Sequence, residues 1–313
     1  MRSQWDQFVT NSKNGTFLFQ RGFMDYHSDR FEDHSLMVFK GNSLLALLPA
    51  NISDSQLHSH QGLSYGGLVL SKKEKLNTTL EIFREVLAFL NKEKIEKLHL
   101  KLVPSIYHKV PSDELEYLLF ITEATLTRVD VSSVIESASR VKIQSNRMEG
   151  VKKAEKNGLE IREEVRFDAF WNEILLSNLE QRHGAKPTHS LEEIELLAAR
   201  FPKHIKQFNV FKKNKIVGGA TIFETQTACH IQYISGNEEK QQLGSLDFLF
   251  EYLITKRFND KKYFDFGISN ENQGRNINKG LLYWKETFGA RTISNKHYTV
   301  HTNNYGKLDT VFL

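Results

Sequence analysis

The chain has 313 residues, a length that suits two ordinary domains, each with a hydrophobic core of its own. Hydrophobic residues make up 40% of the chain and charged residues 26%, which is the balance of a soluble globular protein. The net charge of +4 is too small to indicate a nucleic-acid-binding protein by itself.

The residue types that are rare or missing indicate the compartment. Cys229 is the single cysteine, which excludes an internal disulfide framework and favours a reducing compartment. The first residues lack the apolar run of a signal peptide. No apolar segment approaches the roughly 20 residues that are needed to span a bilayer. We therefore expect a cytoplasmic protein without stable membrane insertion.

The first half of the chain alternates predicted strands with predicted helices. Apolar runs on both sides of the turn Lys40-Gly41-Asn42 predict a hairpin over residues 35–48. A second strand-rich region follows at 58–70, and apolar residues at helical spacing predict an amphipathic helix over 76–92. The other elements predicted for this half are strands at 97–103 and 124–131 and a short helix at 115–120.

The second half opens with a polar, charged connector over 132–157 that is helical in part. A strand is predicted at 159–162 and a helix at 167–179. Residues 210–217 then read as strand, polar turn and strand, as residues 38–45 do. The elements that follow this second hairpin repeat the order of the first half and are a strand at 230–235, a helix at 244–258 and a strand at 263–266.

This shared order of elements indicates two copies of one α/β domain, because the repeat is too long for a solenoid. Chance similarity between two hairpins is the alternative interpretation. We expect an N-terminal domain at 1–135 and a C-terminal domain at 136–313, both with a mixed α/β fold.

The stretch from Tyr263 to Ala290 contains the clearest candidate site. Alternating aromatic residues predict that it begins with a strand, and Gly289 is placed as the C-cap of a short helix. Loops beyond the carboxyl ends of strands are where α/β proteins bind ligands, although an ordinary surface loop is the alternative. Polar and cationic side chains suited to phosphate or an oxyanion lie in or near this loop: Ser269, Asn270, Arg275, Lys279 and Lys285.

A second candidate is the turn formed by Gln241, Gln242, Leu243, Gly244 and Ser245. It lies between a predicted strand and a predicted helix, and the N–H groups at the start of a helix can bind an anion. A plain strand-to-helix turn has the same sequence features, so both interpretations stay open.

Other patterns indicate ordinary structure. His58 and His60 share one face of a strand but lack a third ligand at a useful spacing, so we expect no metal site. Cys229 lies in an apolar strand and is expected in the core. The basic run over 140–156 favours a solvated helix face, with phosphate or RNA binding as the alternative.

Motifs in both halves resemble those of one known family. The first is Asp265-Phe266-Gly267-x-Ser269, followed by Gly280, Tyr283-x-Lys285 and Gly289-Ala290. The others are Lys152-Lys153-Ala154-Glu155-Lys156-Asn157-Gly158-Leu159, Arg182-His183-Gly184-x-x-Pro187-x-His189 and Tyr65-Gly66-Gly67. Together with the repeat, they resemble the GNAT-superfamily acyltransferases related to the FemABX peptidyltransferases, over nearly the whole chain.

This resemblance implies two tandem GNAT-like domains and an acyltransferase, of the N-acetyltransferase or FemABX-like kind. It would move an acetyl or aminoacyl group to an amine or hydroxyl of a small molecule or of a cell-wall or polysaccharide precursor. The implied donor is acyl-CoA or aminoacyl-tRNA, with no metal. Ile268 stands where the family commonly has an arginine, and the long helical hairpin of some FemABX members is missing. Leu246 replaces the last small residue of the pyrophosphate loop, which hinders close backbone approach and keeps aminoacyl-tRNA open as the donor.

Roles for single residues follow from the resemblance and from position. Lys285 is expected to stabilise the oxyanion or to bind an acceptor phosphate, and Tyr283 to donate a proton. Asp265 or Glu224 would act as the base, and Gln241 to Ser245 would hold the donor's phosphates. The candidates for substrate binding are Ser269, Asn270, Arg275, Lys279, Arg182 and His183. A non-catalytic binding protein that keeps the fold, or a nucleic-acid-binding module, is the alternative.

Overall fold

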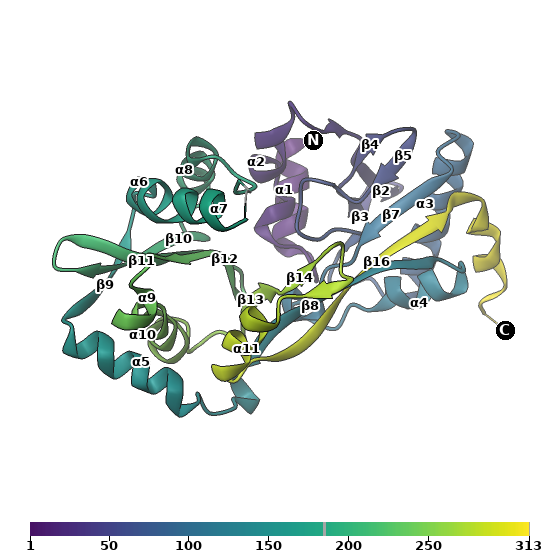
Figure 1. Cartoon of the computed structure of the whole chain (residues 1–313). Helices are drawn as coiled ribbons and strands as arrows, with labels where there is room; N and C mark the ends of the chain where they lie inside the picture. Colours follow the sequence, from purple (N-terminus) through teal and green to yellow (C-terminus); the bar gives the residue numbers. More distant parts are fainter. Residues whose placement is uncertain (184–185, 313) are drawn as a thin grey trace. The chain divides into compact units, whose positions relative to one another are not determined.

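The computed structural model describes residues 1–183 and 186–312, without the side chains of 181–183. The chain forms two compact units (Figure 1). Unit 1 comprises Met1–Asp130 and the chain from Ser294 onward, and unit 2 comprises Val131–Ile293. This division differs from the expected one, because residues 135 and 136 lie inside strand β8 (Thr125–Glu136) and the C-terminal segment belongs to unit 1.

The C-terminal segment belongs to unit 1 because it completes a sheet and a core there. Residues His297–His301 of strand β16 pair antiparallel with strand β7 (Lys97–Lys101). Val300 and Leu308 are buried in the hydrophobic core of unit 1. These pairings join residues about 200 positions apart, so no local pattern predicts them.

Unit 1 contains a mixed sheet of order β1-β4-β5-β7-β16 and a small antiparallel sheet of order β2-β3-β6. In the mixed sheet, β5 and β7 are parallel and the other pairs are antiparallel. Its strands are β1 (Glu32–Asp33), β2 (Leu36–Lys40), β3 (Ser43–Leu48), β4 (Asn51–Ser53), β5 (Gln56–His58), β6 (Val69–Leu70), β7 and part of β16 (Arg291–His301). Its helices are α1 (Arg2–Asn11), α2 (Arg21–Met24), α3 (Leu76–Lys92) and α4 (Glu114–Ile121), with short 3₁₀ turns at Phe17–Phe19, Asp25–His27, Ser105–Tyr107 and Thr302–Thr310.

Helix α3 supplies much of the core of unit 1. Its boundaries coincide with the predicted helix at 76–92, and it buries the apolar stripe on which that prediction rests, including Phe83, Val86 and Leu90. The predicted hairpin at 35–48 is present as β2 and β3. Fully burying side chains of this size contributes about 1.5–3 kcal/mol each.

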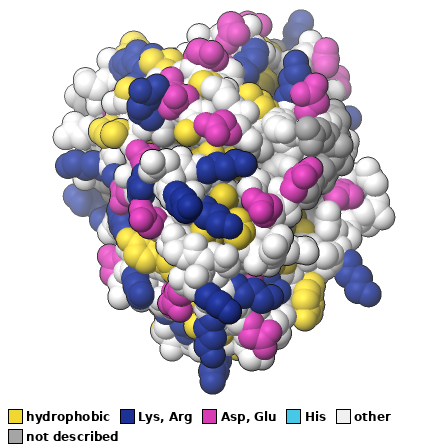
Figure 2. Space-filling model, turned by 60° about the vertical axis from the view of Figure 1, so that its left-hand side comes forward, with side chains coloured by type: hydrophobic (Ala, Val, Ile, Leu, Met, Phe, Trp, Pro, Cys, Tyr) yellow, Lys and Arg dark blue, Asp and Glu magenta, His cyan; other side chains and the backbone are white. Residues whose placement is uncertain are grey.

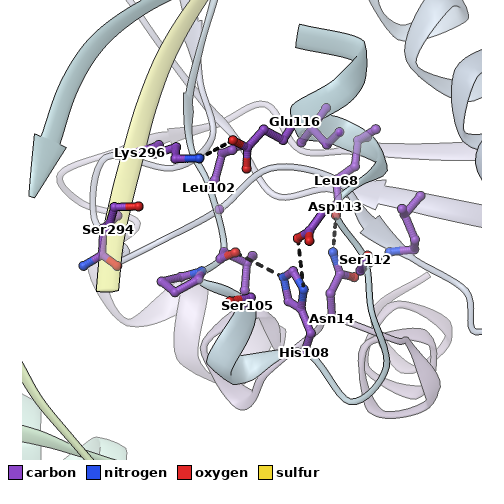
Figure 3. Close-up of a pocket in the computed structure, with 16 residues that line it drawn as sticks. Asn14, Leu68, Leu102, Ser105, His108, Ser112, Asp113, Glu116, Ser294 and Lys296 are labelled. Atoms are coloured by element: carbon purple, nitrogen blue, oxygen red, sulfur yellow. Dashed lines mark hydrogen bonds and ion pairs between the residues drawn. The ribbon is translucent and has the colours of Figure 1, made fainter. Parts of the chain in front are cut away.

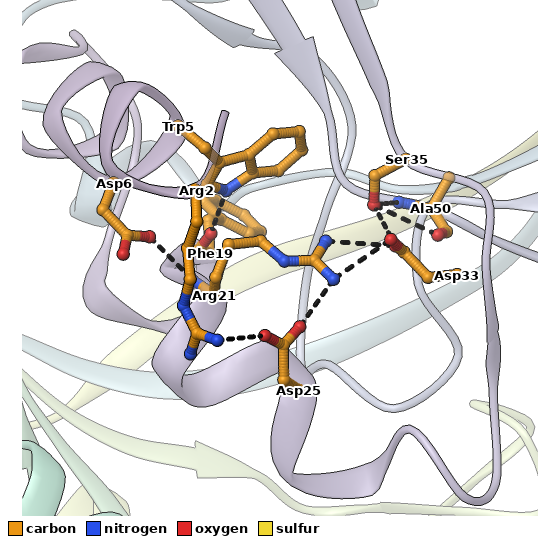
Figure 4. A network of polar contacts seen from close by, with 9 residues as sticks. All are labelled: Arg2, Trp5, Asp6, Phe19, Arg21, Asp25, Asp33, Ser35 and Ala50. Carbon is orange, nitrogen blue, oxygen red and sulfur yellow. Dashed lines mark hydrogen bonds and ion pairs between the residues drawn. The ribbon is translucent and has the colours of Figure 1, made fainter.

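A polar network around Arg21 ties the N-terminal helices to the sheet of unit 1 (Figure 4). The Arg21 guanidinium lies 2.5 Å from Asp25 and 3.0 Å from Asp33, and its backbone N–H donates to Asp6 at 2.7 Å. The indole N–H of Trp5 donates to the carbonyl of Phe19 at 2.7 Å, which satisfies a buried donor. These groups are held in place by one another, so we interpret the network as structural.

Unit 2 is built on a sheet of order β8-β13-β12-β11-β10-β9, in which β12 and β13 are parallel and the other pairs antiparallel. Helices α6, α7 and α8 lie on one face, and α5, α9 and α10 on the other (Figure 1). Its strands are β9 (Leu159–Glu164), β10 (Ile205–Lys212), β11 (Lys215–Glu224), β12 (Ala228–Gly236), β13 (Tyr263–Ile268), β14 (Asn270–Glu271) and β15 (Asn276–Ile277). Its helices are α5 (Ser145–Lys156), α6 (Asp168–Phe170), α7 (Leu176–His183), α8 (Leu191–Arg200), α9 (Lys240–Leu243), α10 (Ser245–Tyr252) and α11 (Lys279–Thr287), with π-helical turns at Trp171–Leu175 and Leu253–Arg257 and a 3₁₀ turn at Ser137–Ser139.

The two predicted hairpins share an irregularity of the backbone. The register between β2 and β3 shifts between Val38 and Phe39, and the register between β10 and β11 shifts between Val210 and Phe211. The sequence comparison of the two halves equates these same residue pairs. Because a β-bulge bends and twists a strand locally, its presence at the matched position supports the duplication.

Helices α5 and α10 meet through two glycines. Gly244 has a φ of +71°, and a Cβ added there would lie 2.0 Å from the carbonyl oxygen of Gly150. A Cβ added to Gly150 would in turn lie 2.0 Å from a carboxylate oxygen of Asp247. Only glycine at both positions allows the two helices to pack at this distance.

We predict that Gly244→Ala lowers the free energy of unfolding by about 2–5 kcal/mol, because it adds a left-handed alanine and an overpacked contact. Gly158→Ala is the matched control, since Gly158 has a φ of +65° but no atom within 4 Å of an added Cβ. The control should lose only about 1–2 kcal/mol. Urea unfolding followed by the fluorescence of Trp171 and Trp284 measures both, and equal losses would contradict the packing argument.

Candidate active site

The parallel strands β12 and β13 separate partway along their length. Ala228–His230 pairs with Tyr263–Asp265. Strand β12 then continues to Gly236 and β13 to Ile268, and the described residues of these two strands form no further pair with each other. In open α/β sheets, ligands bind beyond the carboxyl ends of parallel strands. The end of this pairing therefore marks the candidate site.

A cavity of about 810 Å³ lies beyond the separated end of β12. Its wall is formed by the last residues of that strand and by helices α5, α7, α9, α10 and α11. The charged and aromatic side chains that line it are Arg147, Lys153, Lys240, Asp247, Tyr283 and Trp284. Small-molecule and cofactor sites have volumes of roughly 300–1,000 Å³, so the cavity is large enough for an extended ligand.

An ion pair between Arg147 and Asp247 forms part of the cavity wall. The Nη1 atom of Arg147 lies 2.8 Å from Oδ1 of Asp247, and the indole N–H of Trp284 donates to the same oxygen at 3.4 Å. Burial raises the pKa of Asp247, and the charge of Arg147 opposes the rise. The Nε atom of Arg147 is buried without a hydrogen-bond partner in the described part of the chain, so the guanidinium keeps an unused donor.

A histidine and an aspartate face each other at the last paired position of β12 and β13. The Nδ1 atom of His230 lies 2.8 Å from Oδ2 of Asp265, which is almost fully buried. The other oxygen of Asp265 accepts the backbone N–H of Gly267 at 2.7 Å. Because the carboxylate accepts from Nδ1, the lone pair of a neutral His230 ring lies on Nε2.

Lys285 is buried beside this pair and not exposed in the cavity. Its ammonium donates to the carbonyls of Gly267 at 2.9 Å and Ile268 at 2.7 Å, and 3% of the residue is exposed. Burial lowers the pKa of Lys285 to about 8, and the nearby charge of Asp265 opposes this shift. Lys285 thus joins α11 to the separated end of β13.

The predicted donor turn is largely a helix. Residues Lys240–Leu243 form α9, and the N–H groups of Leu243 and Gly244 donate to the carbonyls of Glu239 and Lys240. Leu243 and Ser245 are buried. Of the five residues expected to bind donor phosphates, Gln241 lines the cavity, whereas Gln242 and Gly244 do not.

The polar segment after β13 is a small hairpin and not an irregular loop, since β14 pairs with β15. Ser269 is buried, and its hydroxyl has no hydrogen-bond partner among the described residues. The side-chain oxygen of Asn270 accepts the N–H of Val131 at 2.6 Å, which gives Asn270 a structural contact. Arg275 and Lys279 are exposed. No residue of this polar segment lines the cavity, whereas Gly280, Leu281, Tyr283 and Trp284 of α11 do, and the side chain of Tyr283 is exposed.

Glu224 lies away from the cavity, although it is across the strands from the residue next to His230. It pairs with Cys229 near the start of β12 and forms an ion pair with Lys261 at 2.8 Å. The cavity begins near Ile234 and Ser235, roughly 15–20 Å further along the strand at about 3.3 Å per residue. The side chains of Arg182 and His183 lie outside the described residues.

Sequence reasoning missed His230, Arg147 and Trp284. The signal for His230 is a single polar residue in the apolar run Ala228-Cys229-His230-Ile231, which local patterning reads only as a strand. The basic run of α5 divides in the structure, because Lys153 and Arg147 line the cavity whereas Lys152 and Lys156 do not. On the face drawn in Figure 2, basic and acidic side chains are intermixed.

No group of three or more His, Cys, Asp or Glu side chains is placed to hold a metal ion within 1–183 and 186–312. The helices of the same residues include none with the length and apolar character needed to cross a membrane.

No family model and no curated protein matches the sequence. Solved structures are similar to it over nearly the whole chain. The structure of FemX has a TM-score of 0.66 at 11% identity and covers 98% of both chains. That of L-PGS from Bacillus licheniformis has a TM-score of 0.63 at 12% identity, covering 96% of this chain and 92% of the other. A tandem GNAT protein from the clavulanic acid biosynthesis pathway has a TM-score of 0.50 at 11% identity, covering 96% and 94%.

At such low sequence identity, structural similarity establishes the fold alone. This fold agrees with the resemblance that the sequence motifs indicate. The chain has a FemABX/GNAT-like fold.

Proposed function

We propose that the chain is an acyltransferase that moves an acyl group from an activated donor to an amine or hydroxyl. The observation that carries the proposal is the separation of β12 and β13, with a cavity at its open end and the His230–Asp265 pair where pairing stops. The solved structures of similar fold include a tandem GNAT protein, which supports the same class of reaction.

The donor would occupy the cavity and extend along β12. Lys153 and Lys240 provide positive charge for its phosphates, and Trp284 provides an apolar wall. From Ile234 back to His230 the strand covers about 13 Å at about 3.3 Å per residue, a span that needs a long flexible donor arm. An acyl thioester of coenzyme A has such an arm.

His230 would act as the base in the transfer. Its Nε2 takes a proton from the acceptor N–H or O–H while the acceptor atom forms a bond to the donor's carbonyl carbon. The tetrahedral intermediate then collapses, the bond to the leaving thiolate or alkoxide breaks, and the proton returns to the leaving group. Asp265 holds the ring in the required tautomer and stabilises the protonated ring, as in other His–Asp pairs.

Lys285 would stabilise the oxyanion of this intermediate. An ammonium has three N–H donors, and two of them serve the carbonyls of Gly267 and Ile268. We assign the third to the developing negative charge, because a positioned cation acts strongly in a desolvated site. Tyr283, which is more exposed, is the alternative proton donor to the leaving group; in that case the proton on His230 is lost to solvent and Tyr283 is reprotonated from solvent.

A second candidate is aminoacyl transfer from an aminoacyl-tRNA. It is favoured by the engagement of the Leu243 and Gly244 N–H groups within α9, which leaves fewer backbone donors for a pyrophosphate. It is also favoured by Leu246, whose bulky side chain lines the cavity and hinders close approach of a pyrophosphate. Cell-envelope precursors are proposed as acceptors for either donor.

Lys153→Met should weaken acetyl-CoA binding by about twofold to fivefold, because an exposed charge pair contributes about 0.4–1 kcal/mol. Lys152→Met is the matched control, since Lys152 is the exposed neighbour on α5 and does not line the cavity. Isothermal titration calorimetry measures both. Equal effects of the two substitutions would contradict the cavity as the donor site. If the unsubstituted protein does not bind acetyl-CoA at all, the aminoacyl-tRNA donor is favoured.

His230→Gln and Asp265→Asn should each lower turnover by about 10²–10⁴-fold, because they remove the base or reverse its tautomer. Release of coenzyme A from acetyl-CoA in the presence of a panel of amines measures turnover. His204→Gln, which changes another histidine of unit 2, should leave it nearly unchanged. If His230→Gln retains turnover with normal folding, the histidine does not act as the proposed base.

Lys285→Met separates catalysis from stability. Oxyanion stabilisation predicts a loss of turnover of about 10²–10³-fold, and normal turnover would contradict that role.

The pKa of Lys285 is about 8 in the folded chain, below the ordinary 10.5. Between these pH values the unfolded chain binds more protons, so the stability of the native protein rises with pH relative to Lys285→Met, by about 1–3 kcal/mol. Lys279→Met changes an exposed residue of the same helix, so its difference in stability from the unsubstituted protein should not vary with pH. If the stability curves of Lys285→Met and the unsubstituted protein are parallel over this pH range, Lys285 is not buried as described.

A further inference from the structure

The sheet edges formed by strands β1, β2 and β6 are protected against pairing with another chain. The side chain of Asn14 covers β6, since it donates to the carbonyl of Leu68 at 2.8 Å and accepts the N–H of Leu70 at 2.9 Å (Figure 3). Strand β1 has only two residues, and its Asp33 is held by Arg21 at 3.0 Å (Figure 4). Strand β2 contains a bulge, which bends it. Covered, short and bulged edges are common means of preventing edge-to-edge association.

Strand β9 forms the outer edge of the sheet of unit 2 and is neither covered, short nor bulged (Figure 1). Its six residues, Leu159–Glu164, pair with β10 from end to end without a register shift. No described residue pairs with its opposite edge. A regular strand with such an edge can accept a further strand, whose main-chain hydrogen bonds then extend the sheet.

Charged side chains of both signs decide which strand β9 can accept. Glu160 and Arg162 lie on one face of β9, and Oε2 of Glu160 lies 2.8 Å from Nη2 of Arg162. Their side chains are 60% and 42% exposed, respectively, so both can also reach an added strand. Like charges directly opposite each other on neighbouring strands are unfavourable, whereas opposite charges stabilise the pairing. The best-fitting strand therefore places a cation opposite Glu160 and an anion opposite Arg162.

A second copy of β9 meets this requirement in one antiparallel register. Directly opposed residues in an antiparallel ladder are of the same hydrogen-bonding type, so a two-fold axis lies at a residue and not between two. The residue at the axis lies opposite its own copy, so an axis at Glu160, Arg162 or Glu163 opposes like charges. An axis at Ile161 places Glu160 opposite Arg162, twice by symmetry. Leu159 then lies opposite Glu163, so no like charges meet within the strand.

We propose that two copies of the chain form a dimer through antiparallel pairing of their β9 strands, with Ile161 at the two-fold axis. The pairing continues the sheet of unit 2 from one copy into the other. On the face that carries Glu160 and Arg162, the charged side chains of the two copies alternate in sign. The residues of the proposed acyl-transfer site lie on other elements, so the dimer does not depend on that function.

The test measures the mass of the full chain by sedimentation velocity, which should show a dimer that dissociates on dilution. Glu160→Lys and Arg162→Glu should each raise its dissociation constant by about tenfold to hundredfold, because symmetry turns two attractive pairs into two repulsive ones. A mixture of the two variants should dimerise like the unsubstituted chain, because each position 160 then faces an opposite charge at position 162. The ion pair within each chain stays broken in this mixture, so recovery of the dimer reports contacts between the chains.

Lys40→Glu mixed with Glu81→Lys is the matched control, since Lys40 belongs to the edge strand β2 and forms an exposed ion pair with Glu81 at 3.3 Å. These variants, alone or mixed, should dimerise like the unsubstituted chain. An unsubstituted chain that stays monomeric up to about 100 µM would overturn the proposal. A mixture of Glu160→Lys and Arg162→Glu that fails to recover the dimer would also overturn it.

Oxidative cross-linking locates the axis independently. Directly opposed residues of an antiparallel pair have Cβ atoms about 4.5–5.5 Å apart, so a disulfide can form after a small adjustment. Ile161→Cys should therefore give a disulfide-linked dimer under mild oxidation. Glu164→Cys is the control, because the two copies of position 164 lie six residues, or roughly 20 Å, apart along the strands. Cys229 is buried and should not react. Equal cross-linking of both variants, or none with Ile161→Cys, would overturn the proposed axis.

Discussion

The structure of unit 2 depends on how strand β13 keeps its backbone groups hydrogen-bonded after its pairing with β12 ends. Beyond Asp265, strand β13 has no ladder bonds to β12, yet Phe266 and Gly267 are buried, and buried backbone groups need partners. Side chains supply them, since Asp265 accepts the N–H of Gly267 and Lys285 donates to two carbonyls. The opening between the strands can therefore persist without exposing or orphaning the backbone. The same two side chains carry the charges on which the proposed chemistry depends.

Packing around the opening fixes the elements that line it. Trp284 of α11 and Phe288, which caps this helix, lie with Phe250 of α10 and Phe266 of β13 in one aromatic cluster, with ring centroids 5.0–5.9 Å apart. Such contacts contribute about 0.5–1.5 kcal/mol each beyond their burial. Because Trp284 also lines the cavity, the core and the site share a side chain. A change in this cluster would move α11 and with it both Tyr283 and Lys285.

The sequence predicts those features that depend on local pattern. The hairpins, helix α3 and the strand–helix order around Lys285 follow from alternation, helical spacing and turn residues. The pairing of β12 with β13 is non-local, so the contact between His230 and Asp265 has no local signal. The helical form of α9 was hidden because a glycine such as Gly244 ends a helix as readily as it forms a turn. Likewise, nothing near the C-terminus indicates that its strand completes the sheet of unit 1.

The division of the chain has a consequence for its synthesis. Unit 2 is one continuous segment, whereas unit 1 is made of two segments separated by the whole of unit 2. Val300 and Leu308, which complete the core of unit 1, leave the ribosome after every residue of unit 2. Domains generally fold as units during translation, beginning at the N-terminus. Here that order is inverted, since the unit that contains the N-terminus has to hold its apolar surface incomplete until the final strand arrives.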